Sequence, residues 1–283
     1  MSLALKEAIR IAENQLQNAG VSDAKISAKE LYCFQAGIDN TRFMMAWQDI
    51  LQDNQLDCYL ELVQRRINRE PLQHIIGVQE FMGFKFKVSP DVLIPRLDTE
   101  CVVEEALKYA KGDVLDLCTG SGAIAVSVAK LADCKVTATD ISEEALKIAK
   151  ENAESNGAKV KFIKSDMFTE LKGTFGLKKY DLIISNPPYI DTMAIGCLEP
   201  EVKDYEPMLA LDGGADGLNF YRIIAEDAPK HLKPGGVLVL EIGDDQGESV
   251  PDLLKATGHF ENIEVLQDLG HLDRIVVAKL IKE

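Results

Sequence analysis

The first 78 residues carry apolar side chains at the spacing of helices. Leu5, Ile9 and Ala12 recur every three or four positions, and the same period returns at 56–67. The segment lacks the alternation of apolar and polar positions that a half-buried strand shows. The pattern therefore predicts an all-helical region that ends near residue 78.

Two capping signals lie early in this region. Ser22 and Asp23 follow Gly20 and are residue types that cap helix N-termini. Ser27 and Glu30 have the three-residue spacing of a capping box. Both pairs predict a helix start in this stretch.

The period changes to two between residues 79 and 97. Phe84, Phe86 and Val88 alternate with polar residues, which is typical of a short β-hairpin rather than of another helix. We interpret this stretch as a hairpin linker between two domains.

From residue 98 onward, strand and helix patterns alternate. Strands are predicted at 113–118, 135–140, 160–164, 180–185, 236–242, 261–266 and 274–280. Helices are predicted at 99–110, 122–131, 143–156, 217–232 and 247–257. Such alternation is typical of an α/β fold with a doubly wound, mostly parallel sheet and helices on both faces. The last two strands lie close enough to form an antiparallel pair at one edge. The sequence thus predicts a helical domain at 1–78, a hairpin linker at 79–97 and an α/β domain at 98–283.

Acidic residues outnumber basic ones: the chain has 46 Asp and Glu and 31 Lys and Arg, which gives a formal net charge of −15. Tight binding to a nucleic-acid backbone needs clustered basic side chains, so we expect no direct nucleic-acid partner. In the helical region only Arg65, Arg66 and Arg69 cluster, and we expect them to form a solvated helix face.

No apolar run approaches the roughly 20 residues that a membrane helix needs. Charged Lys6, Glu7 and Arg10 interrupt the opening residues, unlike the apolar core of a signal peptide. We therefore expect a cytoplasmic protein without a membrane partner, and a monomer. The six cysteines are scattered: Cys33, Cys58, Cys101, Cys118, Cys134 and Cys197. They form no metal-ligand spacing, so we expect reduced thiols and no metal.

A glycine turn follows the first predicted strand of the α/β domain. Residues 119–122 read Thr-Gly-Ser-Gly and open a helix, so the backbone can approach a ligand closely and free N–H groups are available. Asp140 ends the next strand, where a carboxylate can hold ribose hydroxyls. Residues 120–125 also fit the dinucleotide pattern G-x-G-x-x-A, and a turn kept only for packing fits as well.

The third strand ends in further polar groups at the same sheet edge. Asp166 can accept a hydrogen bond from an adenine amino group, and Met167 can pack near the ring. A turn or helix-cap role for Asp166 is equally compatible with the sequence.

The segment Asn186-Pro187-Pro188-Tyr189 follows the predicted strand at 180–185. Each proline pushes the preceding residue out of the α region, so the segment is stiff and extended. Because neither proline has an N–H, the segment presents acceptors: the Asn186 side-chain oxygen and a free backbone carbonyl. These two acceptors can bind both hydrogens of a planar NH₂ group, and the ring of Tyr189 can stack against that group. A plain Pro-Pro turn would not need a preceding apolar strand aimed at this edge.

The first and fourth strands are neighbours in a doubly wound sheet, so the glycine turn and the Asn186 segment are expected to face one another. This favours transfer of an electrophilic methyl group onto nitrogen by orientation and electrostatics rather than by a strong base. The four histidines show no catalytic spacing: His74, His231, His259 and His271.

The turn D-L-C-T-G-S-G at 116–122, Asp140 and N-P-P-Y at 186–189 resemble the class I S-adenosylmethionine-dependent methyltransferases. More narrowly, the chain resembles the release factor glutamine N5-methyltransferases. The segments that carry this resemblance are E-P-L-Q-H-I-I-G (70–77), E-F-M-G-F-K-F-K-V (80–88), L-I-P-R-L-D-T-E (93–100), E-P-M-L-A-L (206–211) and G-H-L-D-R (270–274). Two positions differ from the usual family pattern: Cys118 stands where glycine is common, and Leu97 stands where a proline usually follows Arg96.

The resemblance implies a Rossmann-like methyltransferase domain at 98–283 behind a helical substrate-recognition domain and the hairpin linker. It implies methyl transfer from S-adenosyl-L-methionine, leaving S-adenosyl-L-homocysteine, to the glutamine side chain of the Gly-Gly-Gln motif in class-1 peptide chain release factors. The implied cofactor residues are Asp116, Thr119, Gly120, Ser121, Gly122, Asp140, Ile141, Asp166, Met167 and Asn186. The implied catalytic residues are Asn186, Pro187 and Tyr189, and the implied substrate residues add Pro188 and Arg96.

Four other functions share part of this pattern. An adenine-amino DNA or RNA methyltransferase would also use N-P-P-Y, but it needs a basic face and aromatic residues to unstack a base. A ribosomal-protein glutamine methyltransferase fits the fold, although the I-P-R-x-D-T-E linker is more similar to the release-factor enzymes. An NAD-dependent oxidoreductase would leave N-P-P-Y without a role, and a non-catalytic cofactor-binding protein would not need the intact segment.

Overall fold

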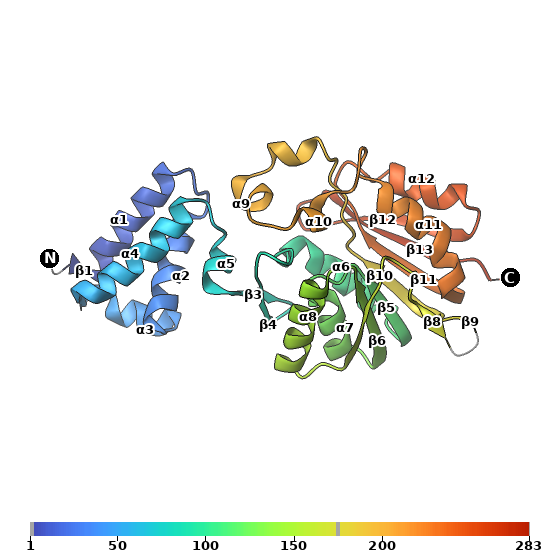
Figure 1. The fold of residues 1–283 in the computed structure, drawn as a ribbon, viewed down its shortest axis with the longest axis horizontal. Coiled ribbons are helices and arrows are strands. Elements are labelled where there is room, and N and C mark those ends of the chain that lie inside the picture. Colours follow the sequence, from blue (N-terminus) through green and yellow to red (C-terminus); the bar gives the residue numbers. More distant parts are fainter. Residues whose placement is uncertain (1–2, 174–175, 283) are drawn as a thin grey trace. The chain divides into compact units, whose positions relative to one another are not determined.

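A computed structural model describes residues 3–173 and 176–282 of the chain. The outer ends of the two predicted domains, residues 1, 2 and 283, lie outside the described residues. Within the described ranges, every helix is too short or too polar to cross a bilayer. Figure 1 labels the elements of the fold.

The chain divides into two compact units. The first comprises Met1–Val78 together with Glu199–Tyr205, and the second comprises Gln79–Leu198 together with Glu206–Glu283. The chain therefore leaves the first unit after residue 78, returns to it for seven residues and leaves it again.

The first unit is mainly helical, as the apolar spacing predicts. Its helices are α1 (Leu5–Asn18), α2 (Ala24–Ala36), α3 (Asn40–Met45), η1 (Ala46–Gln48), α4 (Asp53–Ile67), α5 (Leu72–Ile76) and α9 (Pro200–Lys203). The strands β1 (Leu3–Ala4) and β2 (Ile50–Leu51) also pair antiparallel in this unit. The prediction missed this small sheet because two-residue strands are too short to show alternation.

Tyr59 anchors the core of the first unit. Its ring is fully buried on α4 and lies edge-on to Tyr32 of α2, with 5.7 Å between the ring centroids. Its hydroxyl donates a 2.9 Å hydrogen bond to the carbonyl oxygen of Ala28, which satisfies the one polar atom that burial would otherwise strand. The pair of helices α2 and α4 is thereby fixed in register.

The capping box predicted at Ser27 and Glu30 is wrong. Asp23 occupies the N-cap position of α2, and Ser27 lies inside that helix, fully buried. The Ser27 hydroxyl donates to Asp23 Oδ1 at 3.0 Å and accepts from Arg66 Nε at 3.2 Å. Ser27 thus belongs to a buried polar cluster between helices, and the spacing of residues along the sequence does not reveal this cluster.

Of the three arginines predicted to form a solvated face, Arg65 is exposed as predicted, whereas Arg66 and Arg69 form ion pairs with a distant segment. Arg66 is only 4% exposed and pairs with Asp23 at 2.9 Å and with Glu201 at 2.8 Å. Arg69 pairs with Glu199 and Glu201 from the same returning segment. Glu199 and Glu201 lie about 130 residues further along the chain than these arginines, so no local pattern predicts the pairs.

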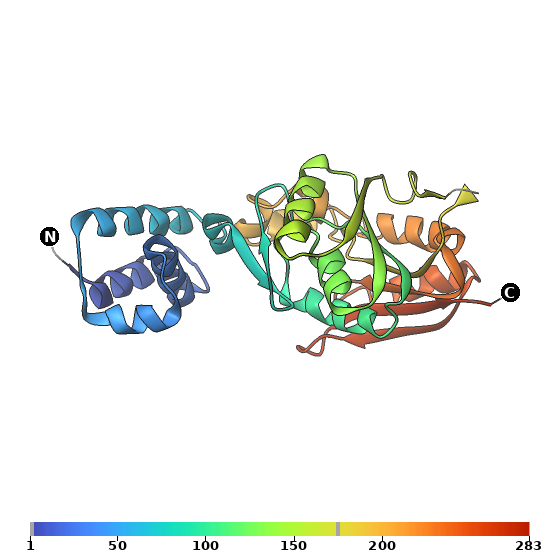
Figure 2. The same cartoon turned by 90° about the horizontal axis from the view of Figure 1, so that it is seen from below.

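The second unit is built on a seven-stranded sheet with the order β12-β13-β11-β10-β5-β6-β7. Its strands are β5 (Gly112–Leu117), β6 (Cys134–Asp140), β7 (Val160–Lys164), β10 (Tyr180–Ser185), β11 (Leu232–Glu241), β12 (Phe260–Gln267) and β13 (Asp273–Leu280). The first five are parallel, whereas β13 pairs antiparallel with β11 and with β12. The dark red strands β12 and β13 form the lower edge of the sheet in Figure 2. The predicted α/β class and its antiparallel edge are confirmed.

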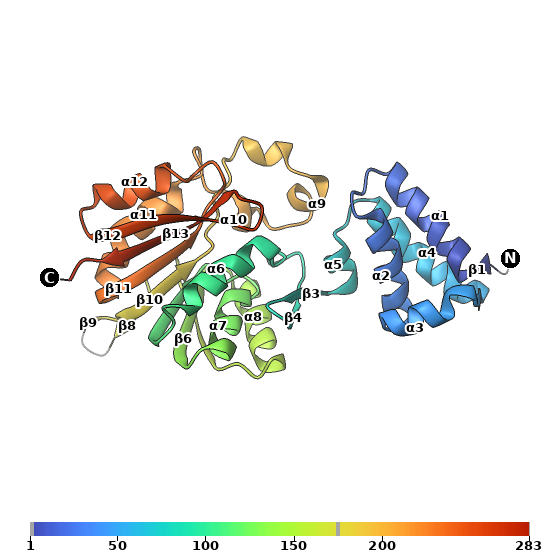
Figure 3. The same cartoon turned by 180° about the vertical axis from the view of Figure 1, so that it is seen from behind.

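Helices cover both faces of this sheet. They are α6 (Leu97–Leu107), α7 (Ala123–Leu131), α8 (Glu143–Ser155), α11 (Asn219–His231) and α12 (Ser249–Ala256), with short η2 (Ala194–Cys197) and α10 (Met208–Leu211) in a connecting stretch. Along β10, Leu182 and Ile184 pack with α6 and α7, whereas Ile183 packs with α11 and α12. The strand is buried on both faces, which explains its uninterrupted apolar run. Figure 3 shows this unit from behind.

Two further two-stranded sheets lie outside the main sheet. The predicted hairpin is formed by β3 (Val78–Phe81) and β4 (Phe84–Lys87), and a second small sheet pairs β8 (Lys172–Gly173) antiparallel with β9 (Gly176–Leu177). Strand β11 begins at Leu232, four residues before the predicted start at 236, so the Pro-Gly-Gly at 234–236 lies within the strand.

Candidate functional site

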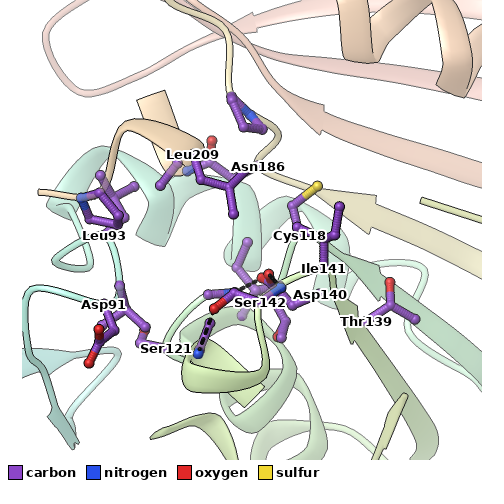
Figure 4. Close-up of a pocket in the computed structure, with 18 of the residues that line it drawn as sticks. Asp91, Leu93, Cys118, Ser121, Thr139, Asp140, Ile141, Ser142, Asn186 and Leu209 are labelled. Atoms are coloured by element: carbon purple, nitrogen blue, oxygen red, sulfur yellow. Dashed lines mark hydrogen bonds between the residues drawn. The ribbon is translucent and has the colours of Figure 1, made fainter. Parts of the chain in front are cut away.

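A cavity of about 620 Å³ opens at the carboxyl ends of the parallel strands in the second unit. Its walls come from the turn after β5, the ends of β6, β7 and β10, and the loop at 90–96 (Figure 4). Ten residues singled out from the sequence line it: Arg96, Thr119, Gly120, Ser121, Asp140, Ile141, Asp166, Met167, Asn186 and Pro188. The lining found among the described residues does not include Asp116, Gly122, Pro187 or Tyr189.

The two glycines of the turn meet different physical demands. Gly120 and Gly122 both have positive φ, +52° and +82°. A Cβ on Gly120 would meet nothing within 4 Å, so this position leaves open space beside the cavity. A Cβ on Gly122 would lie 3.0 Å from the Cβ of Ala149, so this glycine lets α7 begin close to α8.

Asp140 projects its carboxylate at the end of β6. Its Oδ2 accepts a 2.8 Å hydrogen bond from the Gly120 N–H, and its Oδ1 accepts a 2.9 Å hydrogen bond from the Ser142 N–H. Burial raises the pKa of this carboxyl group, and the backbone donors act in the opposite direction. Figure 4 shows Asp140 between the turn and Ser142. Each oxygen keeps a lone pair, so the group can accept two further hydroxyls.

Asp116 lies beneath the turn rather than on the cavity. It is fully buried, and its Oδ2 accepts a 2.6 Å hydrogen bond from the Thr119 hydroxyl. Its Oδ1 has no hydrogen-bond partner among the described residues. Burial raises the pKa of Asp116 to about 7, with the nearby Asp140 adding to the shift. This carboxyl group therefore acts on the cavity through Thr119.

Asn186 lies on the cavity wall directly after β10. Its position is fixed by Ser185, which is fully buried and donates a 2.9 Å hydrogen bond to the Leu117 carbonyl oxygen of β5. Ser185 and Leu117 are paired in the parallel register of these strands. The turn after β5 and the segment after β10 are therefore neighbours on one cavity, as the strand order predicts.

Of the remaining residues of the 186–189 segment, Pro188 lines the cavity and Pro187 and Tyr189 do not. Pro187 is buried, and Tyr189 is largely covered, with its pKa raised to about 12 chiefly by burial. The Tyr189 carbonyl oxygen accepts a 3.1 Å hydrogen bond from Gln246 Nε2, which anchors the end of the segment. Apolar cavity walls come instead from Leu209, Phe220 and Ile223, which the sequence reasoning did not single out.

Three polar side chains beside Asn186 were also missed. Asn186 Nδ2 donates a 3.3 Å hydrogen bond to the hydroxyl of Thr99, a cavity residue on α6. Glu241, at the end of β11, is 2% exposed, and burial raises its pKa to about 7. The positive charge of Arg274 lowers the pKa of Glu241, and Arg274 Nη1 donates a 3.1 Å hydrogen bond to the carbonyl oxygen of Ile242. Thr99 and Arg274 lie in family-like segments, but no spacing links them to Asn186.

The buried carboxylate of Glu206 holds the loop at 90–96 in place. Glu206 accepts a 3.0 Å hydrogen bond from the Ile94 N–H and a 2.5 Å hydrogen bond from Arg96 Nη2, and its side chain is fully buried. Burial raises the pKa of Glu206, while Arg96 opposes the shift. Leu97, where the family usually has proline, begins α6 and is 71% exposed. The charge of Arg96 is thus largely neutralised at the cavity rim.

The lining is mostly apolar, with a few convergent polar groups, which is typical of a small-molecule site. Among the described residues there is no group of three or more His, Cys, Asp or Glu placed to hold a metal ion. The carboxylates of Asp140 and Asp166 and the open backbone at Gly120 suit a nucleoside with free hydroxyl and amino groups.

Two family models match the chain. The methyltransferase small domain matches residues 89–197, and the PrmC N-terminal domain matches residues 7–77. A protein of Geobacter sulfurreducens named release factor glutamine methyltransferase is 43% identical over 94% of this chain and 93% of its own. A protein of the same name from Moorella thermoacetica is 40% identical over 98% of both chains.

Solved structures share the fold at low sequence identity. A methyltransferase from Pyrococcus furiosus superposes with a TM-score of 0.54 at 21% identity, covering 76% of this chain and 96% of its own. The human methyltransferase 10 domain containing protein gives a TM-score of 0.53 at 17% identity over 71% and 90% of the two chains. These likenesses support the class of fold alone.

Proposed function

Because the chain belongs to the release factor glutamine methyltransferase family, we propose that it methylates the side-chain amide nitrogen, N5, of the glutamine in the Gly-Gly-Gln motif of peptide chain release factors. One observation carries this proposal for the site itself. A single cavity holds the glycine turn with Asp140 on one wall and Asn186 on another. A nucleoside-type donor and a planar amide can therefore be bound side by side.

The residues present fit S-adenosyl-L-methionine as the donor. The cavity is roomy enough for a nucleoside, Asp140 has free lone pairs for ribose hydroxyls, and no side chain fills the space at Gly120. When bound, this cofactor supplies an electrophilic methyl group. The residues that we propose to hold it are Thr119, Gly120, Ser121, Asp140, Ile141, Asp166 and Met167, with Asp116 and Gly122 supporting the turn from behind. Asn186 lines the same cavity and would contribute little to the affinity for the cofactor.

Asn186 is proposed to bind and orient the substrate amide. Its side-chain oxygen and a proline carbonyl accept the two N–H groups, which aims the nitrogen lone pair across the cavity. The acceptors also stabilise the positive charge that grows on nitrogen during transfer, and the proton is lost once the nitrogen is cationic. Pro187, Pro188 and Tyr189 keep the segment rigid, and Arg96 lies at the rim where a peptide substrate would enter.

Class-1 release factors are the proposed protein substrates, recognised in part by the helical domain at 1–78. The net charge of −15 would attract a basic partner over a distance, an effect that weakens with salt. We place the protein in the cytoplasm as a monomer, without a direct nucleic-acid or membrane partner.

Methyl transfer can be tested directly with the whole protein. The protein is incubated with methyl-labelled S-adenosyl-L-methionine and, separately, with a release factor, a ribosomal-protein fraction and DNA. We expect label only in the release factor, and mass spectrometry should place it on the Gly-Gly-Gln peptide.

A release factor with Gln→Ala in that motif is the matched control and should stay unlabelled. Label that persists in this control, appears only in ribosomal protein or DNA, or appears nowhere would each contradict the proposal.

A further inference from the structure

We infer that Thr99 and Glu241 are positioning residues that fix which way the Asn186 amide faces, so that its oxygen points to the substrate. This inference rests on the proposed function, in which that oxygen accepts an N–H group of the substrate amide. An asparagine amide has nearly the same shape in both orientations, so only its hydrogen-bond partners decide which end faces the cavity.

The sheet brings the three residues together. Ser185 of β10 and Leu240 of β11 are paired in parallel register, so Asn186 and Glu241 follow at the same level of the same sheet edge. Thr99 reaches this point from α6 and is itself buried. The backbone of Glu241 is anchored by the fully buried Tyr221, whose hydroxyl donates a 2.7 Å hydrogen bond to the Glu241 carbonyl oxygen. The backbone of Glu241 is therefore fixed beside that of Asn186 at this sheet edge.

The polarity of the groups allows one consistent arrangement. A carboxylate only accepts hydrogen bonds, whereas a hydroxyl can donate one and accept another. Both the Thr99 hydroxyl and the Asn186 amide act on the Glu241 carboxyl group and favour its charged form. With its proton turned toward Glu241, Thr99 accepts the 3.3 Å hydrogen bond from Asn186 Nδ2.

The reversed orientation of Asn186 would be unfavourable. It would turn the amide oxygen toward a carboxylate and leave buried acceptors without donors, which costs free energy. In the described structure Glu241 Oε2 already lacks a hydrogen-bond partner, so a reversed amide would bring one more acceptor to a carboxyl group that is short of donors. With the NH₂ group engaged on this side, the Asn186 oxygen remains free for the cavity.

Two other charged side chains also act on the Glu241 carboxyl group. Arg274 lowers the pKa of Glu241 and Asp98 raises it, while burial is the largest influence. Arg274 is itself held by Asp268, with 3.2 Å between Nε and Oδ2. Assays at pH 8 keep the carboxyl group ionised in the wild-type protein, so that the variants are compared against one protonation state.

The kinetic test compares paired variants. Glu241→Met and Thr99→Val remove the acceptor and the hydroxyl, and each should lower kcat by about 10- to 100-fold through misorientation of the amide. KM for the release factor and Kd for S-adenosyl-L-homocysteine should stay within about twofold, because only the orientation at the reacting nitrogen changes. Glu241→Gln and Thr99→Ser restore an acceptor and a hydroxyl, so each should recover most of the lost kcat.

Glu105 offers a matched control. It is a buried carboxyl group on the same helix as Thr99, but it pairs with Lys108 and Tyr109 and does not line the cavity. Glu105→Met should keep the wild-type kcat. Full kcat in Glu241→Met and Thr99→Val would overturn the inference, as would a parallel loss of cofactor affinity or a Thr99→Ser variant no better than Thr99→Val.

A second measurement does not depend on the substrate. The side-chain NH₂ signal of Asn186 in a ¹⁵N spectrum can be identified by its absence from Asn186→Ala. Its hydrogens should exchange with solvent slowly in the wild-type protein and at least about tenfold faster in Glu241→Met. Equal exchange rates would overturn the inference. A wild-type protein that methylates no release factor would contradict the proposed function alone, because the exchange experiment still decides the orientation.

Discussion

The side-chain amide of Asn152 donates a 2.8 Å hydrogen bond to the carbonyl oxygen of Ser121. Asn152 lies on α8, and it also donates to the carbonyl oxygen of Lys87 at 3.0 Å and accepts from the Lys87 N–H at 2.7 Å. It is 1% exposed, so water cannot replace these bonds. One side chain thus ties the glycine turn and the hairpin to the same helix.

Asn152→Asp should destabilise the protein. The carboxylate cannot donate to either carbonyl, so we expect the free energy of unfolding to fall by about 2–3 kcal/mol in urea denaturation. Asn156→Asp is the control, because Asn156 makes a similar 2.8 Å bond to the Lys85 carbonyl oxygen in an exposed position. Its loss should stay below about 1 kcal/mol. Equal losses in the two variants would contradict this interpretation.

Asp140→Asn should weaken cofactor binding. Both carboxylate oxygens accept backbone N–H groups, so an amide must direct its own NH₂ at one of those donors. We expect Kd for S-adenosyl-L-homocysteine to rise by about 10- to 100-fold in calorimetry. Asp133→Asn, an exposed carboxyl group just before β6, should leave Kd unchanged. An unaltered Kd in Asp140→Asn would show that this carboxylate does not hold the cofactor.

Alanine at the two turn glycines should separate folding from binding. Gly122→Ala places a Cβ against Ala149 at a positive φ, so it should lower the free energy of unfolding by about 2–4 kcal/mol. Gly120→Ala meets open space and should cost only about 1 kcal/mol, for its backbone conformation. Its methyl group would occupy space proposed for the cofactor. Relative to the loss in free energy of unfolding, Kd for S-adenosyl-L-homocysteine should therefore rise more in Gly120→Ala than in Gly122→Ala. The reverse ranking in thermal unfolding would refute this division.

Asp116 should make stability depend on pH. Its folded pKa of about 7 lies above the ordinary value of 3.8, so between these values the folded state holds a proton that the unfolded state has released. Its contribution therefore falls as pH rises from about 4 to about 7. Asp116→Asn should remove this contribution and gain about 4 kcal/mol relative to the wild type across that window. Unfolding curves at pH 5 and 7.5 test this, and a constant difference between the two proteins would count against it.

Asn186→Ala should abolish methyl transfer while cofactor binding changes little. The side-chain oxygen is the acceptor proposed for the substrate amide, so its loss should lower kcat by about 10²- to 10³-fold. Thr99 and Glu241 would stay in place, and the glycine turn proposed to bind the cofactor follows another strand, so the affinity for the cofactor should be kept. Calorimetry with S-adenosyl-L-homocysteine provides the comparison. A simultaneous loss of activity and cofactor affinity would mean that Asn186 is structural.

Local sequence was enough to predict the sheet and its turn. A strand buried on both faces, such as β10, reads as an apolar run, and the glycine turn after β5 follows from backbone geometry. Asn186 could be singled out for the same reason, because two consecutive prolines restrict the backbone whatever surrounds them.

The supporting residues could not be predicted in this way. Thr99 and Glu241 meet Asn186 only because α6 and β11 pack at the same sheet edge, and Glu206 meets Arg96 from 110 residues away. Ser27 was misread because it lies inside α2, where its hydroxyl joins the N-cap residue Asp23 to Arg66 of another helix. Periodicity reports which face of an element is buried, but it does not report which polar group lies opposite.

The seven residues from Glu199 to Tyr205 have a consequence for synthesis on the ribosome. Helix α4 is made long before Glu201, so the buried guanidinium of Arg66 must wait for one of its two carboxylates while more than a hundred residues emerge. The N-terminal helices cannot complete their own charge balance early, although domains often fold in the order of translation. Their final stability is therefore set late, once about two-thirds of the chain exists.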